Sequence, residues 1–179
     1  NKLRELGALF FFYQVDISQY EQLESVIQQC INRFRKINGL IHTAGVSNPA
    51  LLEFKSRMEV NETLLPKIYG TFNLAKSLNN CSLDFAIFTS SLSALVGGYQ
   101  QIDYSSANAC LDAFVDSGIF ASCSFVTSVN WNTWRDVGIA AEAASKGEAT
   151  FIGKGDDISP QQGQELFLRI LQEGENRVA

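Results

Sequence analysis

Short apolar runs alternate with helix-period segments along this chain, and this alternation restricts its fold more than any other feature. Residues 9–15 form a near-continuous apolar and aromatic run, which is typical of a parallel strand covered on both faces. In residues 20–36, apolar side chains recur at steps of three and four, which predicts an amphipathic helix covering one face of a sheet. This order predicts an α/β fold built on a doubly wound parallel sheet with right-handed crossovers.

The alternation continues to the end of the chain. Strands are expected over the later short runs, at residues 39–42, 83–89 and 124–131, and another strand is expected to begin within 176–179. Helices are expected over the longer segments, at residues 53–78 with an interruption at Pro66, 104–115 and 160–173. No internal repeat or long linker divides the chain, so we expect a single domain.

Residues 135–157 lie between the last long strand and the last helix. They are rich in Ala, Gly and Lys, with only a weak apolar stripe. Because they leave the carboxyl end of a strand, we expect them to form a lid over the cleft there, anchored at Trp134. An ordinary flexible surface loop is the alternative.

Composition and charge argue against several functions. The net charge is −5 and no run of Lys or Arg is present, which argues against a nucleic-acid-binding or membrane-binding surface. No apolar stretch of about 18 residues is present to span a bilayer. The four cysteines form no Cys-x-x-Cys pair and the chain has one histidine, so we expect neither a disulfide framework nor a metal site. A reducing cytoplasm is the predicted location.

The spacing of three polar residues, Ser91, Tyr104 and Asn108, indicates a reaction at a carbonyl group. Tyr104 and Asn108 lie one helical turn apart and so share a helix face. Ser91 ends the strand before that helix, and a crossover brings the end of a strand close to the start of the next helix. A phenol, a hydroxyl and an amide around one carbonyl suit protonation of its oxygen during hydride transfer. Lys67 is the candidate cation near this helix, and a nearby ammonium would lower the pKa of the tyrosine and ease proton donation.

Each of these residues also has a purely structural interpretation. A lone Tyr-x-x-x-Asn on a helix is usually without function, and Ser91 could simply satisfy backbone groups in a turn. Lys67 could be a solvated helix residue. His42 is more often a packed histidine at a strand end than an acid or base, and Asp16 could be only a cap for the helix that follows.

Taken in order, the motifs of this chain resemble the ketoreductase domain of modular polyketide synthases, a branch of the short-chain dehydrogenase/reductase superfamily. They are Asp16 after the first strand, His-Thr-Ala-Gly-Val at 42–46, Pro-Lys-Ile-Tyr-Gly at 66–70, Phe-Thr-Ser-Ser at 88–91, Tyr-Ser-Ser-Ala-Asn at 104–108, and the segment 129–138. The resemblance implies a Rossmann-like fold of the short-chain dehydrogenase/reductase type. It implies NADPH-dependent reduction of a β-ketoacyl group linked through phosphopantetheine to an acyl carrier protein, in a multienzyme with neighbouring synthase domains.

The resemblance also implies a role for individual residues. Tyr104 would be the proton donor, Ser91 would hydrogen-bond the ketone, and Lys67 with Asn108 would complete a catalytic tetrad. Cofactor-binding positions carried over from the family are Asp16, Ile17, His42, Ala44, Gly45, Lys67 and Tyr104. His42 has no proton-transfer role in the family.

Parts of the family pattern are absent from this chain. No Gly-x-Gly-x-x-Gly turn follows a first strand, and Gly153-Lys154-Gly155 comes too late to replace it. We therefore expect residues 1–179 to form a partial ketoreductase catalytic subdomain of a longer molecule. Ser47-Asn48-Pro49 and Val96 occupy the positions that distinguish the two stereochemical types, so neither type is indicated.

Two other functions stay open at this point. One is a free-standing short-chain reductase acting on a small ketone. The other is a non-catalytic, ketoreductase-like scaffold domain. The presence of Lys67, Ser91, Tyr104 and Asn108 together argues against the scaffold.

Overall fold

Four parallel strands form one sheet in this computed structural model, which describes residues 2–145, 157–174 and 177–178. The strands lie in chain order and are β1 (Gly39–His42), β2 (Phe85–Ser91), β3 (Val126–Trp131) and β4 (Arg177–Val178). In the register, Ile41 lies opposite Ile87, and Ile87 lies opposite Thr127. Because neighbouring strands are parallel, each connection must cross over the sheet.

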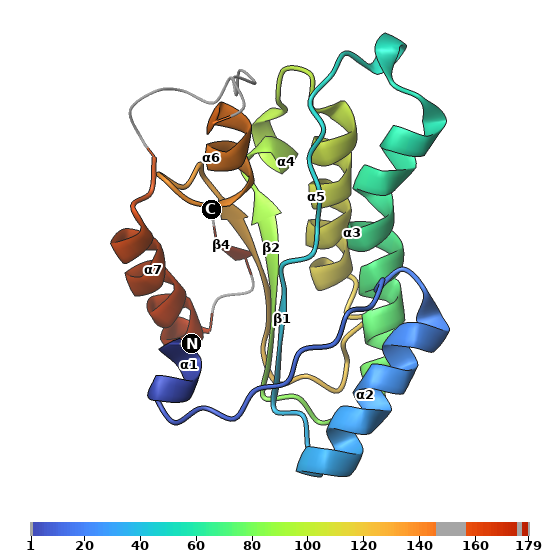
Figure 1. Ribbon diagram of the computed structural model, residues 1–179, viewed down its shortest axis with the longest axis vertical. Helices are drawn as coiled ribbons and strands as arrows, with labels where there is room; N and C mark the ends of the chain where they lie inside the picture. Colours follow the sequence, from blue (N-terminus) through green and yellow to red (C-terminus); the bar gives the residue numbers. More distant parts are fainter. Residues whose placement is uncertain (1, 146–156, 175–176, 179) are drawn as a thin grey trace.

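Helices make these crossovers and cover both faces of the sheet. The crossover helices are α3 (Arg57–Leu78), α5 (Ile102–Asp116) and α7 (Pro160–Glu173). Figure 1 shows α3 and α5 on one side of the sheet, with α2 (Tyr20–Phe34) alongside α3, and α7 on the other side. The predicted doubly wound α/β sheet is therefore confirmed. The remaining short elements are α1 (Lys2–Glu5), η1 (Leu52–Phe54), α4 (Ser93–Val96) and α6 (Gly138–Ser145).

The strand side chains alternate between two apolar clusters. Phe88 and Leu111 are fully buried in the larger cluster, between the sheet and α3 and α5. Ile87 faces the other way and packs with Val129 and Ile170 under α7. Because both faces of β2 are covered, its sequence is a nearly continuous apolar run rather than an alternating one.

The predicted strand at residues 9–15 is not formed. A strand exists through its ladder of hydrogen bonds to a neighbour, and no described strand pairs with this segment. Its apolar side chains lie largely in solvent, with Leu9 72% and Phe12 85% exposed. Phe11 instead contacts the end of α2, with its ring centroid 5.8 Å from that of Phe34 and 3.8 Å from the Arg33 guanidinium carbon.

The predicted interruption at Pro66 is also absent. α3 begins after Ser56, whose hydroxyl accepts a hydrogen bond from the Glu59 backbone N–H, while the Glu59 carboxylate accepts one from the Ser56 N–H at 2.7 Å. The helix then continues through Pro66 to its end. Proline removes one helical hydrogen bond, and the burial of Thr63 and Lys67 on either side holds the helix together there.

The other expected elements agree with the structure to within a few residues. The predicted strand at 39–42 and the helix at 160–173 have the bounds that the structure gives to β1 and α7. The strand expected within residues 176–179 is β4, which pairs with β3. Within the described ranges, no helix has the length and apolar character needed to cross a membrane.

The buried face of α5 is expected to carry much of the stability of the fold. Leu111→Ala removes a side chain that is 0% exposed and should lower the free energy of unfolding by about 2–5 kcal/mol. Ile102→Ala on the same helix, where the side chain is 53% exposed, should change it by less than about 1 kcal/mol. Urea unfolding of the two variants measures both values, and equal losses would contradict this placement of the core.

Candidate active site

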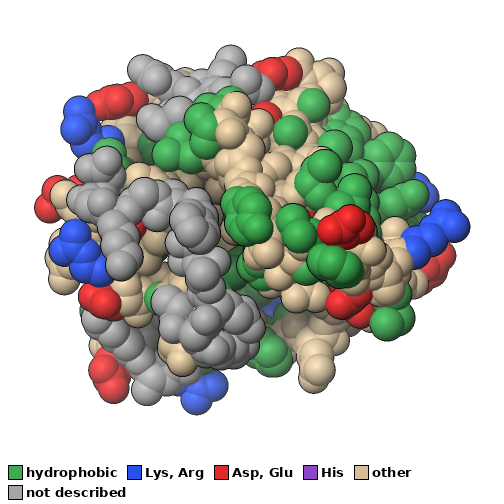
Figure 2. Space-filling model, turned by 90° about the horizontal axis from the view of Figure 1, so that it is seen from above, with side chains coloured by type: hydrophobic (Ala, Val, Ile, Leu, Met, Phe, Trp, Pro, Cys, Tyr) green, Lys and Arg blue, Asp and Glu red, His purple; other side chains and the backbone are tan. Residues whose placement is uncertain are grey.

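A cavity of about 780 Å³ opens at the carboxyl ends of the strands. The last residues of β2 and β3 line it, together with the segment after β1, the start of α5 and residues of α6 and α7. Figure 2 looks down on this end of the molecule and shows hydrophobic side chains over its middle and right, with Lys and Arg mainly at the margins. In open parallel sheets this end is where ligands bind.

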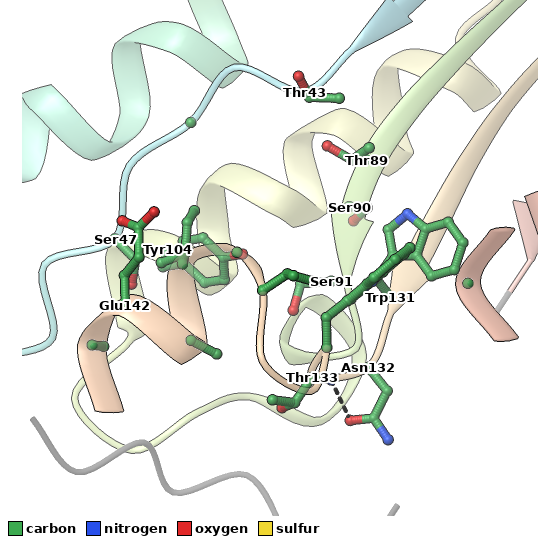
Figure 3. A pocket seen from close by; sticks show the side chains of 18 of the residues that line it. Thr43, Ser47, Thr89, Ser90, Ser91, Tyr104, Trp131, Asn132, Thr133 and Glu142 are labelled. Atoms are coloured by element: carbon green, nitrogen blue, oxygen red, sulfur yellow. Dashed lines mark hydrogen bonds between the residues drawn. The ribbon is translucent and has the colours of Figure 1, made fainter. Parts of the chain in front are cut away.

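Ser91 ends β2 inside this cavity, and its side chain is positioned by Ser93. The Ser91 Oγ accepts hydrogen bonds from the Ser93 backbone N–H at 3.2 Å and from the Ser93 hydroxyl at 3.1 Å. A hydroxyl has two acceptor sites and one proton. With both acceptor sites occupied, the Ser91 hydroxyl can donate its proton into the cavity, where it contacts the Tyr104 phenol beside it (Figure 3).

Tyr104 reaches the cavity from the first turns of α5. Burial raises the pKa of its phenol above the ordinary value, and contacts with the side chains of Asn108 and Ser91 lower it by less. The expected lowering of this pKa is wrong for the ligand-free chain, in which burial has the largest effect and Lys67 is not among the groups that shift it. The phenol therefore stays protonated at neutral pH, which is the form that can donate a proton.

Lys67 enters the same cavity from α3 and is almost fully buried. Its Nζ donates a hydrogen bond to the Thr89 backbone carbonyl at 2.8 Å. The stem of the side chain crosses directly over Gly45, where an added Cβ would lie 2.8 Å from Lys67 Cε. Burial lowers the pKa of Lys67 to about 8, and the negative charge of Asp112 opposes part of that shift. The ammonium therefore predominates at pH 7, and its pKa lies close to that pH.

Asn108 lies behind this group and does not line the cavity. It is 0% exposed, and its Nδ2 donates a hydrogen bond to the Tyr104 backbone carbonyl at 2.8 Å. Its amide thus holds the turn of α5 from which the Tyr104 side chain extends. Of the four residues predicted to be catalytic, Ser91, Tyr104 and Lys67 meet in one cavity, and Asn108 supports them from behind.

Asp16 and Ile17, both predicted to bind cofactor, lie away from the cavity. The Asp16 carboxylate is exposed and accepts a hydrogen bond from the Ser18 backbone N–H at 2.9 Å. Ile17 packs on α3, where an added Cβ on Gly70 would lie 2.6 Å from Ile17 Cδ1. The Asn73 side chain donates to the Ile17 carbonyl at 3.0 Å and so fixes this segment to α3.

The predicted cofactor-binding residues at the end of β1 and just after it differ in whether they line the cavity. Gly45 lines the cavity, whereas His42 and Ala44 do not. His42 is 3% exposed, and its ring packs edge-on against Phe88. Burial lowers the pKa of His42 to about 4, and the nearby Lys67 ammonium adds to this shift. His42 is therefore neutral at pH 7, as its packed position requires.

Trp131 and Ser93 were not recognised from the sequence as parts of this site, and Trp134 was expected only as the anchor of a lid over the cleft. Trp131 and Trp134 form one wall, with ring centroids 5.0 Å apart and an interplanar angle of 65°. Trp134 lies on Gly163 of α7, where an added Cβ would come within 2.1 Å of the indole. The sequence signal that could have indicated this wall is a tryptophan at the end of a strand followed three residues later by a second one. Ser93, which supports Ser91, has no comparable signal.

The segment predicted to be a lid is described in part. Residues 138–145 form α6, and Ile139, Glu142 and Ala143 on it line the cavity. Residues 146–156, which include Gly153-Lys154-Gly155, lie outside the described residues. The opening and closing of this segment stay a prediction.

No cluster of three or more His, Cys, Asp or Glu side chains suited to a metal is found in the described part of the chain. All four cysteines are free thiols. The side chains that line the cavity include hydroxyl, phenol, ammonium and indole groups and the carboxylate of Glu142.

The comparisons with known proteins agree on one family. A family model described as "KR domain" matches residues 1–136. Polyketide synthase PksN of Bacillus subtilis (strain 168) is 33% identical over 150 residues, which cover 79% of this chain and 3% of PksN. This chain spans only between 2% and 10% of the length of the curated relatives that it matches.

Solved structures show the same likeness in three dimensions. An N-terminal ketoreductase from the macrolactin assembly line matches with a TM-score of 0.85 and 28% identity, over 98% of this chain and 34% of that chain. A ketoreductase domain from the bacillaene assembly line matches with a TM-score of 0.84 and 27% identity, over 98% of this chain and 43% of that chain. The arrangement of strands and helices around the cavity is thus shared with these structures.

The buried His42 gives a prediction about pH. Its pKa in the folded chain is about 4, below the 6.5 of an ordinary histidine, so the unfolded chain binds a proton first as the pH falls. Stability should therefore decrease between pH 6.5 and 4, with about 3 kcal/mol of the loss due to His42. Urea unfolding at both pH values measures the loss, and in His42→Gln it should be smaller by this amount.

The same chain allows a direct check, because His42 is its single histidine. Its ring-proton resonance should titrate near pH 4 in the folded chain. A midpoint near 6.5 would show that the ring is solvated and would contradict its burial against Phe88.

Proposed function

We propose, given that this chain belongs to the KR domain family of polyketide synthases, that it reduces a β-ketoacyl group to the β-hydroxyacyl product with NADPH. In this proposal residues 1–179 are part of a ketoreductase catalytic domain. The observation that carries the proposal is the meeting of Ser91, Tyr104 and Lys67 in one cavity at the carboxyl ends of the strands.

The cavity has the properties that a nicotinamide cofactor needs. Its volume of about 780 Å³ is within the range of ordinary ligand pockets. Gly45 exposes bare backbone on one side, and the Trp131 indole offers a flat apolar surface on another. The bound cofactor would supply the hydride that adds to the ketone carbon. Gly45, Lys67 and Tyr104 are the proposed contacts within this cavity, and Asp16, Ile17, His42 and Ala44 are proposed contacts outside it.

The chain's own residues would handle the oxygen of the ketone. As the carbonyl is reduced, negative charge develops on this oxygen and a proton must reach it. The Ser91 hydroxyl, which contacts the Tyr104 phenol, can donate a hydrogen bond to that oxygen when the ketone is bound. Tyr104 holds its proton at neutral pH because burial raises its pKa, and so it can deliver this proton. The Lys67 ammonium, fixed by the Thr89 carbonyl, stabilises the charge that develops nearby.

The apolar walls strengthen these interactions. The Trp131 and Trp134 rings and the α6 side chains border the polar group and exclude water from its surroundings. Hydrogen bonds and charges act more strongly in such a site than in water. Asn108 acts on Tyr104 through its hydrogen bond to the Tyr104 backbone carbonyl and through a side-chain contact with the phenol, so its proposed role is to orient Tyr104.

The substrate and partners are inferred from the relatives. These relatives are polyketide synthases, and the solved structures are ketoreductases of assembly lines. We therefore propose a β-ketoacyl substrate carried on the phosphopantetheine arm of an acyl carrier protein, with other synthase domains as neighbours. The cytoplasm is the proposed location.

Replacing the proton donor tests this function. In the full-length protein, Tyr104→Phe should lower the rate of ketone reduction by about 10²-fold or more, because the phenolic proton is lost. Affinity for NADPH should stay nearly unchanged, because the ring is retained. Tyr99→Phe is the matched control, since Tyr99 is 61% exposed and should give the wild-type rate.

NADPH oxidation with an acyl-pantetheine ketone measures the rates, and cofactor fluorescence measures binding. Wild-type reduction by Tyr104→Phe would remove Tyr104 from the mechanism. If the wild type binds NADPH but reduces no β-ketoacyl thioester, the non-catalytic scaffold becomes the better account. If it reduces small free ketones and no thioesters, a free-standing reductase becomes the better account.

A further inference from the structure

A buried polar cluster lies directly behind the cavity. Asn130 of β3 is 2% exposed, and its Nδ2 donates to Asp112 Oδ2 at 2.8 Å and to Ser90 Oγ at 3.1 Å. Asp112 of α5 and Ser90 of β2 are each 5% exposed. The cluster therefore joins three elements at an almost fully buried place, and Ser90 connects it to the lining of the cavity.

The cluster is connected to the residues of the site. The Asn130 Nδ2 is 3.3 Å from the Ser91 backbone carbonyl, and the Ser90 hydroxyl donates to the Asn108 backbone carbonyl at 3.3 Å. Asp112 lies one turn after Asn108 on the same face of α5. That face lies against β2 and β3, next to Thr89, whose carbonyl binds the Lys67 ammonium, and α5 as a whole packs on α3.

A carboxylate is expensive to bury, so its position here calls for a physical reason. Taking an ion out of water is unfavourable unless an opposite charge or hydrogen bonds compensate. Asn130 supplies a hydrogen bond, and the buried ammonium of Lys67 on the facing helix supplies the opposite charge. Asp112 correspondingly opposes the fall in the pKa of Lys67 that burial causes.

The other groups that face Lys67 do not supply this charge. His42 on β1 is neutral, the Tyr104 phenol on α5 is protonated, and β2 presents the uncharged Thr89 carbonyl. On α3 itself, the neighbouring charged residues Glu62 and Lys76 are exposed to solvent. Glu142 of α6 also lines the cavity but is exposed, and the buried Asp103 of α5 is paired with Lys55. Among the described residues, Asp112 is the buried carboxylate whose charge acts on Lys67.

We propose that Asp112, held by Asn130, is a positioning residue that keeps Lys67 in its ammonium form inside the buried site. The link to ketone reduction rests on the proposed function, whereas the electrostatic link between the two side chains does not. Without Asp112, burial would act on Lys67 unopposed. A larger share of the lysine would then be neutral at pH 7, and its charge would be lost from beside Ser91 and Tyr104.

The proton equilibrium of Lys67 tests the electrostatic link directly. In the full chain labelled with [ε-¹³C]lysine, the Lys67 resonance, assigned with Lys67→Met, should titrate near pH 8. In Asp112→Asn the midpoint should fall by about one pH unit or more, since a partner of opposite charge shifts a pKa by about that amount. The new amide can still accept the hydrogen bond from Asn130, so the fold is expected to persist.

Two further variants complete this measurement. Asp116→Asn makes the same change one turn later on α5, where the side chain is exposed, and should leave the Lys67 midpoint in place. Asp112→Glu keeps the charge and should restore most of the shift. An unmoved Lys67 midpoint in folded Asp112→Asn, or an equal shift in Asp116→Asn, would overturn the proposal.

A second variant covers the case in which Asp112→Asn does not fold. Asn130→Ala keeps the Asp112 carboxylate but removes the amide that holds it at 2.8 Å, so the Lys67 midpoint should also fall in this variant. An unmoved Lys67 midpoint in folded Asn130→Ala would equally reject the proposal.

Enzyme kinetics then test the functional consequence. In the full-length protein, the alkaline limb of the pH profile for ketone reduction should move to lower pH in Asp112→Asn and stay in place in Asp116→Asn. A general loss of stability would lower the rate at every pH without moving the limb. If the wild type shows no reduction, the proposed function fails, while the titration of Lys67 still decides the electrostatic link.

Discussion

The contact between the buried Lys67 ammonium and the Thr89 carbonyl is the constraint on which the rest of this site depends. At 2.8 Å it fixes the middle of α3 to the end of β2, across the backbone of Gly45. A side chain at position 45 would collide with the lysine stem, so the glycine is required by close approach. The helix must also reach Lys67 without a break, and α3 does so through Pro66. A buried cation in turn calls for the negative charge that Asp112 supplies.

β2 changes from apolar to polar along its length, with the polar residues at its carboxyl end. Phe88 and Ile87 are fully buried in β2, and the same strand ends in buried Ser90 and Ser91. Burying hydroxyl, amide and charged groups is unfavourable for stability unless each is paired. Here the apolar clusters on both faces of the sheet hold the strand ends in place, so that paired polar groups can be kept in a water-poor site. Such perturbed and buried groups gather at functional sites.

Two sequence-based predictions were wrong. The pKa of Tyr104 was expected to be lowered by a neighbouring ammonium, yet burial raises it and Lys67 is not among the groups that shift it. Burial disfavours the charged form of the phenol, and its extent is set by the tertiary packing around the ring. Residues 9–15 were expected to form a strand, yet no described strand pairs with them. An apolar run indicates only that a segment can be buried. A strand also needs a partner strand at hydrogen-bonding distance.

The sequence by itself determined the α/β class, the order of the elements and the three cavity residues Ser91, Tyr104 and Lys67. These follow from patterns within single segments: apolar runs, helical spacing and short motifs. Only the tertiary structure decided that Asn108 lies behind the cavity, that Ile17 packs on α3, and that Asn130 and Asp112 join behind the site. The physical reason is that burial, distance and electrostatic partners are set by packing between segments far apart in the chain, and periodicity along one segment carries no information about them.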